Sequence, residues 1–332
     1  MKKHLCLLLS LFLALPLFCS CEKNVYPLSS TEFMMDTVIT ITVYDGEADA
    51  LDGAIKLCKQ YENLFSRTVE TSDIAKINNS NGTPVTVNPE TAELLKIALD
   101  VAEKSDGAFD PTVLPLVELW NVTKNTTPPE QDKITEGLKS VGYKNIHLDG
   151  NTVTAKNGVK LDLGGIAKGY ITDKVVEHLK QKKVTSAIIN LGGNLYLLGD
   201  KKGEPFSVGI QKPFGKQDEH SAVLMLENKT AVTSGVYQRY FKHNGQLYHH
   251  IIDPKTGHPA DNGLYAVTVI ADSSSLADGL STACLLLGTE KAIALATKYD
   301  AELIIITSDH QLITTNGINR NTKKGETVLN LK

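Results

Sequence analysis

Strand and helix periodicities alternate along most of this chain, and this alternation constrains its fold more than any other feature. β-Branched residues fill the segment 34–44 in a strand pattern, and apolar residues recur at helical spacing over 48–65. A second helix is predicted over 88–104, and several hairpin-like segments over 206–252. Further strands are expected at 145–161, 186–190, 264–270 and 303–307, and further helices after the glycines at 164 and 165 and at 276–287 and 290–299. The pattern predicts an α+β fold with predominantly antiparallel sheets and flanking helices.

The first residues of the chain have the pattern of an export signal. Lys2 and Lys3 precede an apolar run at 5–18, and Ser20 and Cys21 follow it. A basic start, a short apolar run and small residues are typical of a secretory signal, and the run is shorter than the roughly 20 residues of a membrane-spanning helix. Ser20 before Cys21 resembles a bacterial lipoprotein processing site, with cleavage without lipidation as the alternative. We predict a signal peptide at 1–20, a tether at 21–32 and one domain at 33–332, exported and lipid-anchored at Cys21 to a bacterial membrane, facing the periplasm.

Cysteine content and charge exclude several classes of protein. Beyond Cys21 the chain has only Cys58 and Cys284, and they have neither a disulfide nor a zinc spacing. The formal net charge is -4 and the pI is about 6.2, so there is no basic field for nucleic acid. We therefore expect an ordinary hydrophobic core and no nucleic-acid partner.

A strand that ends at two glycines and leads into a helix is the first candidate site. Asp162 precedes Gly164 and Gly165, and Lys168 follows in the first helical turn. Free backbone N–H groups, the helix dipole and the lysine charge would favour a phosphate here. The alternative is a tight turn with a solvated lysine.

A carboxylate and a hydroxyl four residues apart form the second candidate site. Asp278 and Thr282 share one face of the predicted helix, and their oxygens are of the kind that Mg²⁺ prefers. The alternative is that Asp278 closes a capping box with Ser275.

Two further segments carry chemically useful side chains. His249 and His250 lie on a strand that leads into a turn at Pro254 and Gly257, so at most one histidine can face a pocket. We expect His249 to be exposed, and a histidine is a natural general base near neutral pH. In the loop at 106–112, the ring of Phe109 could pack on a planar ligand or fill the core.

Taken together, the motifs DGAFDPT, DLGGIAKGY, HHIIDPKTG and ADGLSTA closely resemble, in this order, the ApbE family of FAD:protein FMN transferases. Met35-Asp36-Thr37 resembles the methionine-x-threonine motif of that family, and the resemblance spans about 33–307. It implies a T-fold-like architecture and Mg²⁺-dependent transfer of FMN from FAD to a threonine of another protein, with release of AMP. The alternatives are a FAD pyrophosphatase that gives FMN and AMP, and a FAD-binding lipoprotein without catalysis.

The resemblance also implies roles for individual residues. Lys168 would lie near the pyrophosphate of FAD, and His250 would be the base for the attacking threonine. The remaining FAD contacts would be Met35, Ala108, Phe109, Asp110, Asp162 and Ile252, and the Mg²⁺ ligands would be the carbonyl of Gly165 with Asp278, Thr282 and Ser281. Thr68 stands where the family usually has a tyrosine that contacts FAD. The implied acceptors are flavin-bearing subunits of membrane redox pumps.

Overall fold

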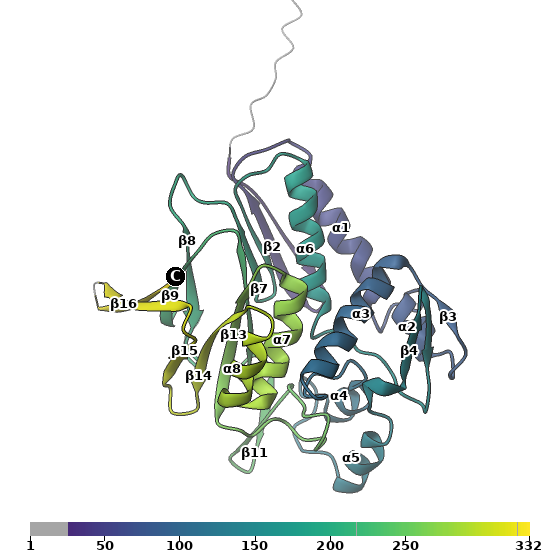
Figure 1. Cartoon of the computed structure of the whole chain (residues 1–332). Coiled ribbons are helices and arrows are strands. Elements are labelled where there is room, and N and C mark those ends of the chain that lie inside the picture. The colour runs from purple at the N-terminus through teal and green to yellow at the C-terminus, as the bar shows by residue number, and fades with distance from the viewer. Residues whose placement is uncertain (1–25, 217, 324) are drawn as a thin grey trace, which may run out of the picture.

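An eight-stranded sheet forms the centre of the protein (Figure 1). A computed structural model describes residues 26–216, 218–323 and 325–332, so the expected signal peptide and Cys21 lie outside the described residues. The strand order is β1-β2-β6-β7-β10-β13-β14-β15, and every neighbouring pair is antiparallel. These strands are β1 (Leu28–Met34), β2 (Thr37–Val43), β6 (Ala187–Leu191), β7 (Asn194–Leu198), β10 (Lys229–Gly235), β13 (Leu264–Ala271), β14 (Glu302–Thr307) and β15 (Leu312–Thr314).

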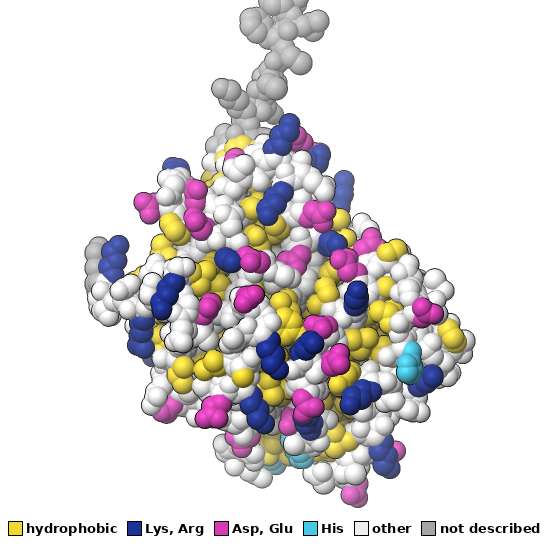
Figure 2. Space-filling view, viewed as in Figure 1, with side chains coloured by type: hydrophobic (Ala, Val, Ile, Leu, Met, Phe, Trp, Pro, Cys, Tyr) yellow, Lys and Arg dark blue, Asp and Glu magenta, His cyan; other side chains and the backbone are white. Residues whose placement is uncertain are grey.

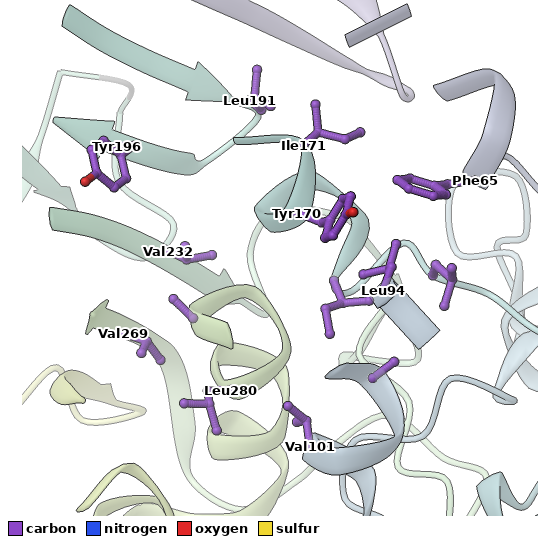
Figure 3. Close-up of a cluster of buried hydrophobic side chains, with 14 of the residues drawn as sticks. Phe65, Leu94, Val101, Tyr170, Ile171, Leu191, Tyr196, Val232, Val269 and Leu280 are labelled. Atoms are coloured by element: carbon purple, nitrogen blue, oxygen red, sulfur yellow. The ribbon is translucent and has the colours of Figure 1, made fainter. Parts of the chain in front are cut away.

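Helices cover one face of this sheet and bury their apolar sides against it. They are α1 (Ala50–Phe65), α6 (Ala167–Gln181), α7 (Ser274–Leu287) and α8 (Thr289–Thr297), with α3 (Pro89–Lys104) packed on α7. Figure 3 shows Leu280 of α7 beside Val269 of β13 in this core. The rings of Phe65 and Tyr170 meet edge to face at 5.6 Å, which joins α1 to α6. The predicted helices are thus confirmed, with ends shifted by a few residues.

A second sheet covers the other face of the central sheet. Its order is β16-β17-β9-β8, with β17 and β9 parallel, and its strands are β8 (Phe206–Gln211), β9 (His220–Leu226), β16 (Ile318–Lys323) and β17 (Glu326–Leu331). Strand β13 is buried on both sides, because Val267 and Val269 face the helices while Ala266 and Ile270 face the second sheet. This double burial explains the continuous apolar pattern of the strand.

Shorter elements complete the fold beside the helical layer. They are α2 (Asp73–Asn78), α4 (Leu114–Trp120), α5 (Gln131–Leu138), the 3-10 turn η1 (Tyr143–Asn145), the sheet β3-β5-β4 (Val85–Thr86, Thr152–Ala155 and Ile146–Asp149) and the hairpin of β11 (Tyr240–His243) with β12 (Gln246–His249). The indole N–H of Trp120 donates to the carbonyl of Gly257 at 2.7 Å, so α4 holds the turn that follows β12.

Two tight turns lie side by side at one end of the central sheet. Met35 and Asp36 join β1 to β2 with φ values of 53° and 55°, and Gly192 and Gly193 join β6 to β7 with φ values of 63° and 91°. Positive φ at both positions is typical of a type I′ hairpin turn. A Cβ at Gly192 would lie 2.4 Å from Oγ1 of Thr37, so glycine lets the two turns touch.

The turn at 35–36 corrects one prediction from the sequence. The single strand expected at 34–44 is the second half of a hairpin, and its first half, β1, begins at Leu28. The edge strand of the sheet is therefore Leu28–Met34, and its first five residues, 28–32, fall in the segment predicted as the tether.

The surface and the cysteines agree with an ordinary hydrophobic core and with the modest net charge. Figure 2 shows acidic and basic side chains interspersed over the visible face. Cys58 and Cys284 are buried free thiols, and burial raises the pKa of each to about 12. Among the helices of the described residues, none combines the length and the apolar character that a membrane crossing requires.

Candidate functional site

A cavity of about 310 Å³ opens where the two hairpin turns meet the N-terminal end of α6 and the inner side of α7. Nearly all of the residues proposed from the sequence line it: Met35, Ala108, Phe109, Asp110, Asp162, Gly165, Lys168, His250, Ile252, Asp278 and Thr282. They come from segments far apart in the chain, and the fold brings them into one pocket of the size that ligand sites have.

The start of α6 supplies a cation, and most of its backbone N–H groups are occupied. Lys168 lies in the first turn of α6, and its Nζ donates to the carbonyl of Gly164 at 3.0 Å. The N–H of Gly164 donates to Oδ1 of Asp162, and those at 166 and 167 both donate to the carbonyl of Leu163. The expected cradle of free N–H groups is therefore wrong for these positions, because the turn uses them itself. The side chain of Lys168 remains as a source of positive charge toward the cavity.

Asp278 is a buried carboxylate in the wall of the cavity. It is 5% exposed, and its Oδ2 accepts a 2.9 Å hydrogen bond from the N–H of Gly169. No group within the described residues donates to its Oδ1, and the residue lines the cavity. Burial raises the pKa of Asp278, against the opposing effects of Lys168 and the Gly169 N–H.

A different aspartate caps α7, which rejects the capping box proposed for Asp278. The N-cap is Ser273, and Asp173 of α6 accepts hydrogen bonds from Ser273 Oγ, from the N–H groups of Ser274 and Ser275, and from Ser275 Oγ, at 2.6–3.0 Å. Asp278 is thus free for another role. The same contacts fix α6 against α7 and so place Lys168 near Asp278.

Close approach of these two helices requires Gly169. A Cβ at this position would lie 2.1 Å from the carbonyl oxygen of Ser274 and 2.7 Å from Cβ of Asp278. Only glycine lets the backbone of α6 come near enough for its N–H to reach the carboxylate.

Residues with oxygen atoms suited to a magnesium ion line the cavity together with Asp278. Thr282 follows one turn later on α7, and a Cβ at Gly165 would lie 3.6 Å from Thr282 Oγ1, so the glycine turn passes close to that hydroxyl. Within the described residues, no group of three His, Cys, Asp or Glu side chains could hold a metal. One carboxylate, a hydroxyl and backbone carbonyls still form a hard oxygen set of the kind that magnesium takes, with water or substrate oxygens completing it.

Ser281 is placed differently from the prediction. It is fully buried and does not line the cavity. Its hydroxyl donates to the carbonyl of Asp278 at 2.9 Å and lies 2.8 Å from Ser234 Oγ, and Ser234 is also 3.3 Å from Thr282 Oγ1. Ser281 therefore supports the wall of the cavity from behind, and Ser234 of β10 forms part of that wall.

The loop at 106–112 forms a further part of the cavity wall. Phe109 is 4% exposed, and its ring would lie 3.3 Å from a Cβ at Gly165, so it both fills the core and lines the cavity. The carboxylate of Asp110 accepts from the N–H and hydroxyl of Thr112 and from the N–H of Tyr143. Asp110 therefore holds the loop in shape, and burial raises its pKa despite these bonds.

The two neighbouring histidines have opposite environments. His249 is 3% exposed, its Nε2 donates to the carbonyl of Ala260 at 2.8 Å, and its Nδ1 accepts from the N–H of Ile251. The prediction that His249 is exposed is wrong, because its side of β12 packs against the segment at 260. His250 is half-buried and lines the cavity.

His250 has the protonation state of a base. Its Nδ1 lies 3.3 Å from the carbonyl of Arg239, which can only accept, so Nδ1 carries the proton and Nε2 keeps a lone pair. Burial, with His249 and Arg239 as further causes, lowers the pKa of His250 to about 4. The imidazole is therefore neutral near pH 7.

Thr68 lies outside the cavity, whereas its neighbour Arg67 lines it. Thr68 is exposed and its hydroxyl bonds to Ser66, while Nε of Arg67 lies 3.5 Å from Oδ2 of Asp162.

Arg67 and several other cavity residues were not found from the sequence. Asn194 is 1% exposed, and its Nδ2 has no partner within the described residues. The further unpredicted lining residues include Gly192, Gly193, Gln238 and Arg239. The Gly-Gly pair between two strands was the one signal that could have indicated this turn.

Comparisons with known proteins match most of this chain. The sequence model of the ApbE family matches residues 35–306. The FAD:protein FMN transferase of Treponema pallidum (strain Nichols) is 35% identical over 305 residues, which cover 85% of this chain and 84% of that protein. The enzyme of the same name from Klebsiella pneumoniae (strain 342) is 34% identical over 298 residues, covering 88% and 92%.

Solved structures also resemble the fold. The apbe protein from Thermotoga maritima has a TM-score of 0.81 and 36% identity, covering 88% of this chain and 97% of that one. The flavin transferase ApbE from Vibrio cholerae has a TM-score of 0.79 and 25% identity, covering 87% and 96%.

Proposed function

This chain belongs to the ApbE family and is a FAD:protein FMN transferase, and we propose that it uses Mg²⁺ to transfer FMN to a threonine hydroxyl of an exported protein. The observation that carries the proposal is the state of Asp278. Its carboxylate is buried, one oxygen has no protein donor within the described residues, and the capping role belongs to Asp173. A buried carboxylate that is left partly unpaired is costly unless a cation completes it.

Asp278, Thr282 and the carbonyl of Gly165 are the residues proposed to hold the metal. When bound, Mg²⁺ neutralises charge on the pyrophosphate and on the departing phosphate of AMP. Lys168 adds a protein charge on the same side of the cavity, from the first turn of α6. Phe109 and Ala108 offer an apolar wall for the rings of FAD.

His250 is the proposed base for the attacking hydroxyl. The threonine oxygen forms a bond to the phosphorus of the FMN half of FAD, and the bond from that phosphorus to the AMP oxygen breaks. The hydroxyl proton passes to Nε2 of His250, and AMP leaves. A histidine with so low a pKa is a weak base, but a loose transition state needs only modest proton removal.

Export and lipidation at Cys21 are the proposed setting of this reaction. The basic start, the short apolar run and Ser20-Cys21 support this proposal. An enzyme anchored in this way would meet exported acceptors, and flavin-bearing subunits of membrane redox pumps are the acceptor class that we propose.

Incubation with FAD, Mg²⁺ and such a subunit tests the proposed function. We expect AMP and a fluorescent acceptor band in a denaturing gel, with neither product from Asp278→Ala. AMP together with free FMN and an unlabelled acceptor would identify a FAD pyrophosphatase instead. FAD that stays intact would identify a binding protein without catalysis.

A further inference from the structure

Large hydrophobic side chains that are exposed gather at the mouth of the cavity. Within the described residues they are Phe33, Val38, Phe214 and Tyr240, which are 72%, 57%, 42% and 39% exposed. None of the four lines the cavity, so they do not belong to the walls of the FAD pocket. We call these four residues the apolar rim.

Two members of the apolar rim lie on the β1–β2 hairpin. Phe33 and Val38 are paired across the two strands, immediately next to the Met34↔Thr37 pair that closes the turn. The turn itself, from Met35 to Thr37, lines the cavity. The two exposed side chains are therefore held a fixed, short distance from the cavity mouth.

The other two members come from two different segments, Tyr240 from the start of β11 and Phe214 from the connection between β8 and β9. Tyr240 directly follows Arg239, which lines the cavity and whose Nη2 donates to the carbonyl of Asp36 at 3.0 Å. The ring of Phe214 packs edge to face on that of Tyr240 at 5.6 Å. The bond from Arg239 to Asp36 thus ties the two halves of the apolar rim together.

Exposed hydrophobic side chains are ordinary when they are scattered, and their concentration at one place indicates an interaction site. The reaction supplies a reason for this place, because its second substrate is a protein whose hydroxyl must enter the cavity. We propose that the apolar rim docks the acceptor protein, by receiving apolar side chains that flank the hydroxyl residue. This inference rests on the proposed function.

Such docking would act on the acceptor alone. Because the apolar rim lies outside the cavity walls, its loss leaves FAD binding and the charged groups around Asp278 in place. An acceptor segment held on both sides of the mouth would present its hydroxyl to the phosphorus and shield that approach from water.

The double variant Phe33→Thr/Val38→Thr tests the hairpin side. Threonine suits these positions, because Thr31 and Thr40 already form a cross-strand pair two residues further along the same two strands. Their hydroxyl oxygens lie 3.1 Å apart. The matched control is Thr31→Ala/Thr40→Ala, which changes the same hairpin and keeps its apolar tip.

Steady-state transfer is measured with the acceptor subunit that the wild-type protein labels in the gel assay. We expect the KM for that acceptor to rise at least ~10-fold in the rim variant, the effect of losing apolar anchors at an interface. The kcat at saturating acceptor and FAD affinity, from flavin fluorescence quenching, stay at wild-type values. The control variant keeps the wild-type KM.

Tyr240→Thr repeats the test on the other side of the mouth, on a segment that does not depend on the hairpin fold. A raised acceptor KM in this variant supports the inference even if the hairpin variant fails to fold. An unchanged acceptor KM in both variants, beside an active wild type, overturns the docking role and leaves the proposed function intact. If the wild type is a dimer, the variants are monomers and the acceptor KM is unchanged, the apolar rim contacts a second copy of the chain. That result would also overturn the docking role. No labelling of any acceptor by the wild type would refute the proposed function itself.

Discussion

Replacing Asp278 with asparagine should stabilise the metal-free protein while it abolishes the response to magnesium. The side chain keeps its size, and the amide oxygen can still accept from the N–H of Gly169. The amide nitrogen then takes the place of the oxygen that has no donor within the described residues. What disappears is a buried negative charge that is partly balanced by Lys168.

The expected gain follows from the burial of this charge. Desolvation of a buried ion costs several kcal/mol, of which the Gly169 bond and Lys168 offset a part. We expect a net gain of about 1–2 kcal/mol for the metal-free variant at pH 7, or about 1.5–3 °C in Tm for a chain of this length.

The gain should also depend on pH with a defined sign. Because burial raises the folded-state pKa of Asp278, its favourable contribution is complete below the unfolded pKa and is lost as pH rises through the folded pKa. The difference in Tm between metal-free Asp278→Asn and wild type should therefore grow from about pH 4 to about pH 7.

Thermal unfolding with and without millimolar MgCl₂ measures both effects. Magnesium should raise the Tm of the wild type and leave that of the variant unchanged. Asp173→Asn is a matched control on the same helix pair, and it should be destabilised by about 1–3 kcal/mol. In either orientation of the amide its nitrogen would face a donor, the N–H of Ser274 in one and the donors of Ser273 and Ser275 in the other. A metal-free Asp278→Asn protein that is less stable than wild type, or one that still responds to magnesium, would refute this reasoning.

Three other predictions concern the helix contact, the base and the anchor. Gly169→Ala should destabilise the fold by about 1–3 kcal/mol and abolish the magnesium shift in Tm, because the new Cβ forces α6 away from Ser274. A variant whose Tm rises with magnesium as much as that of the wild type would contradict this. His250→Ala should lower the rate of transfer about 100-fold. In the wild type, the rate should fall on the acid side near pH 4, because His250 becomes protonated only there. A fall near pH 6.5 would reject His250 as the base. Cys21→Ser should release the protein from membranes on fractionation, and unchanged membrane association would reject lipidation at this residue.

The elements with a strong local pattern could be predicted from the sequence, because their periodicity is long or their end signals are clear. Helix α3 is an example, with Asn88 at its N-cap and proline in its first turn. Strand β1 could not be found in this way. Its residues are mostly exposed and polar, and its turn has Met35 and Asp36 at positive φ rather than an Asn-Gly pair.

The candidate site was predictable in its residues and less so in their roles. Proximity along the chain suggested Ser275 as a partner of Asp278, whereas the actual cap of α7 is Asp173, about a hundred residues earlier. Strand alternation showed that His249 and His250 face opposite ways but did not show that both sides are covered. Contacts between distant segments decided these roles, and no local pattern encodes them.

Mass spectrometry of the acceptor tests the central claim most directly. The full-length protein is incubated with FAD, Mg²⁺ and the exported acceptor subunit, and the digested acceptor is sequenced by fragmentation. We predict a mass gain of one FMN less one water, carried by a threonine and accompanied by an equal amount of AMP, with no gain when Asp278→Ala replaces the wild type. AMP formation with an unmodified acceptor, or FMN on the acceptor with Asp278→Ala, would contradict the account.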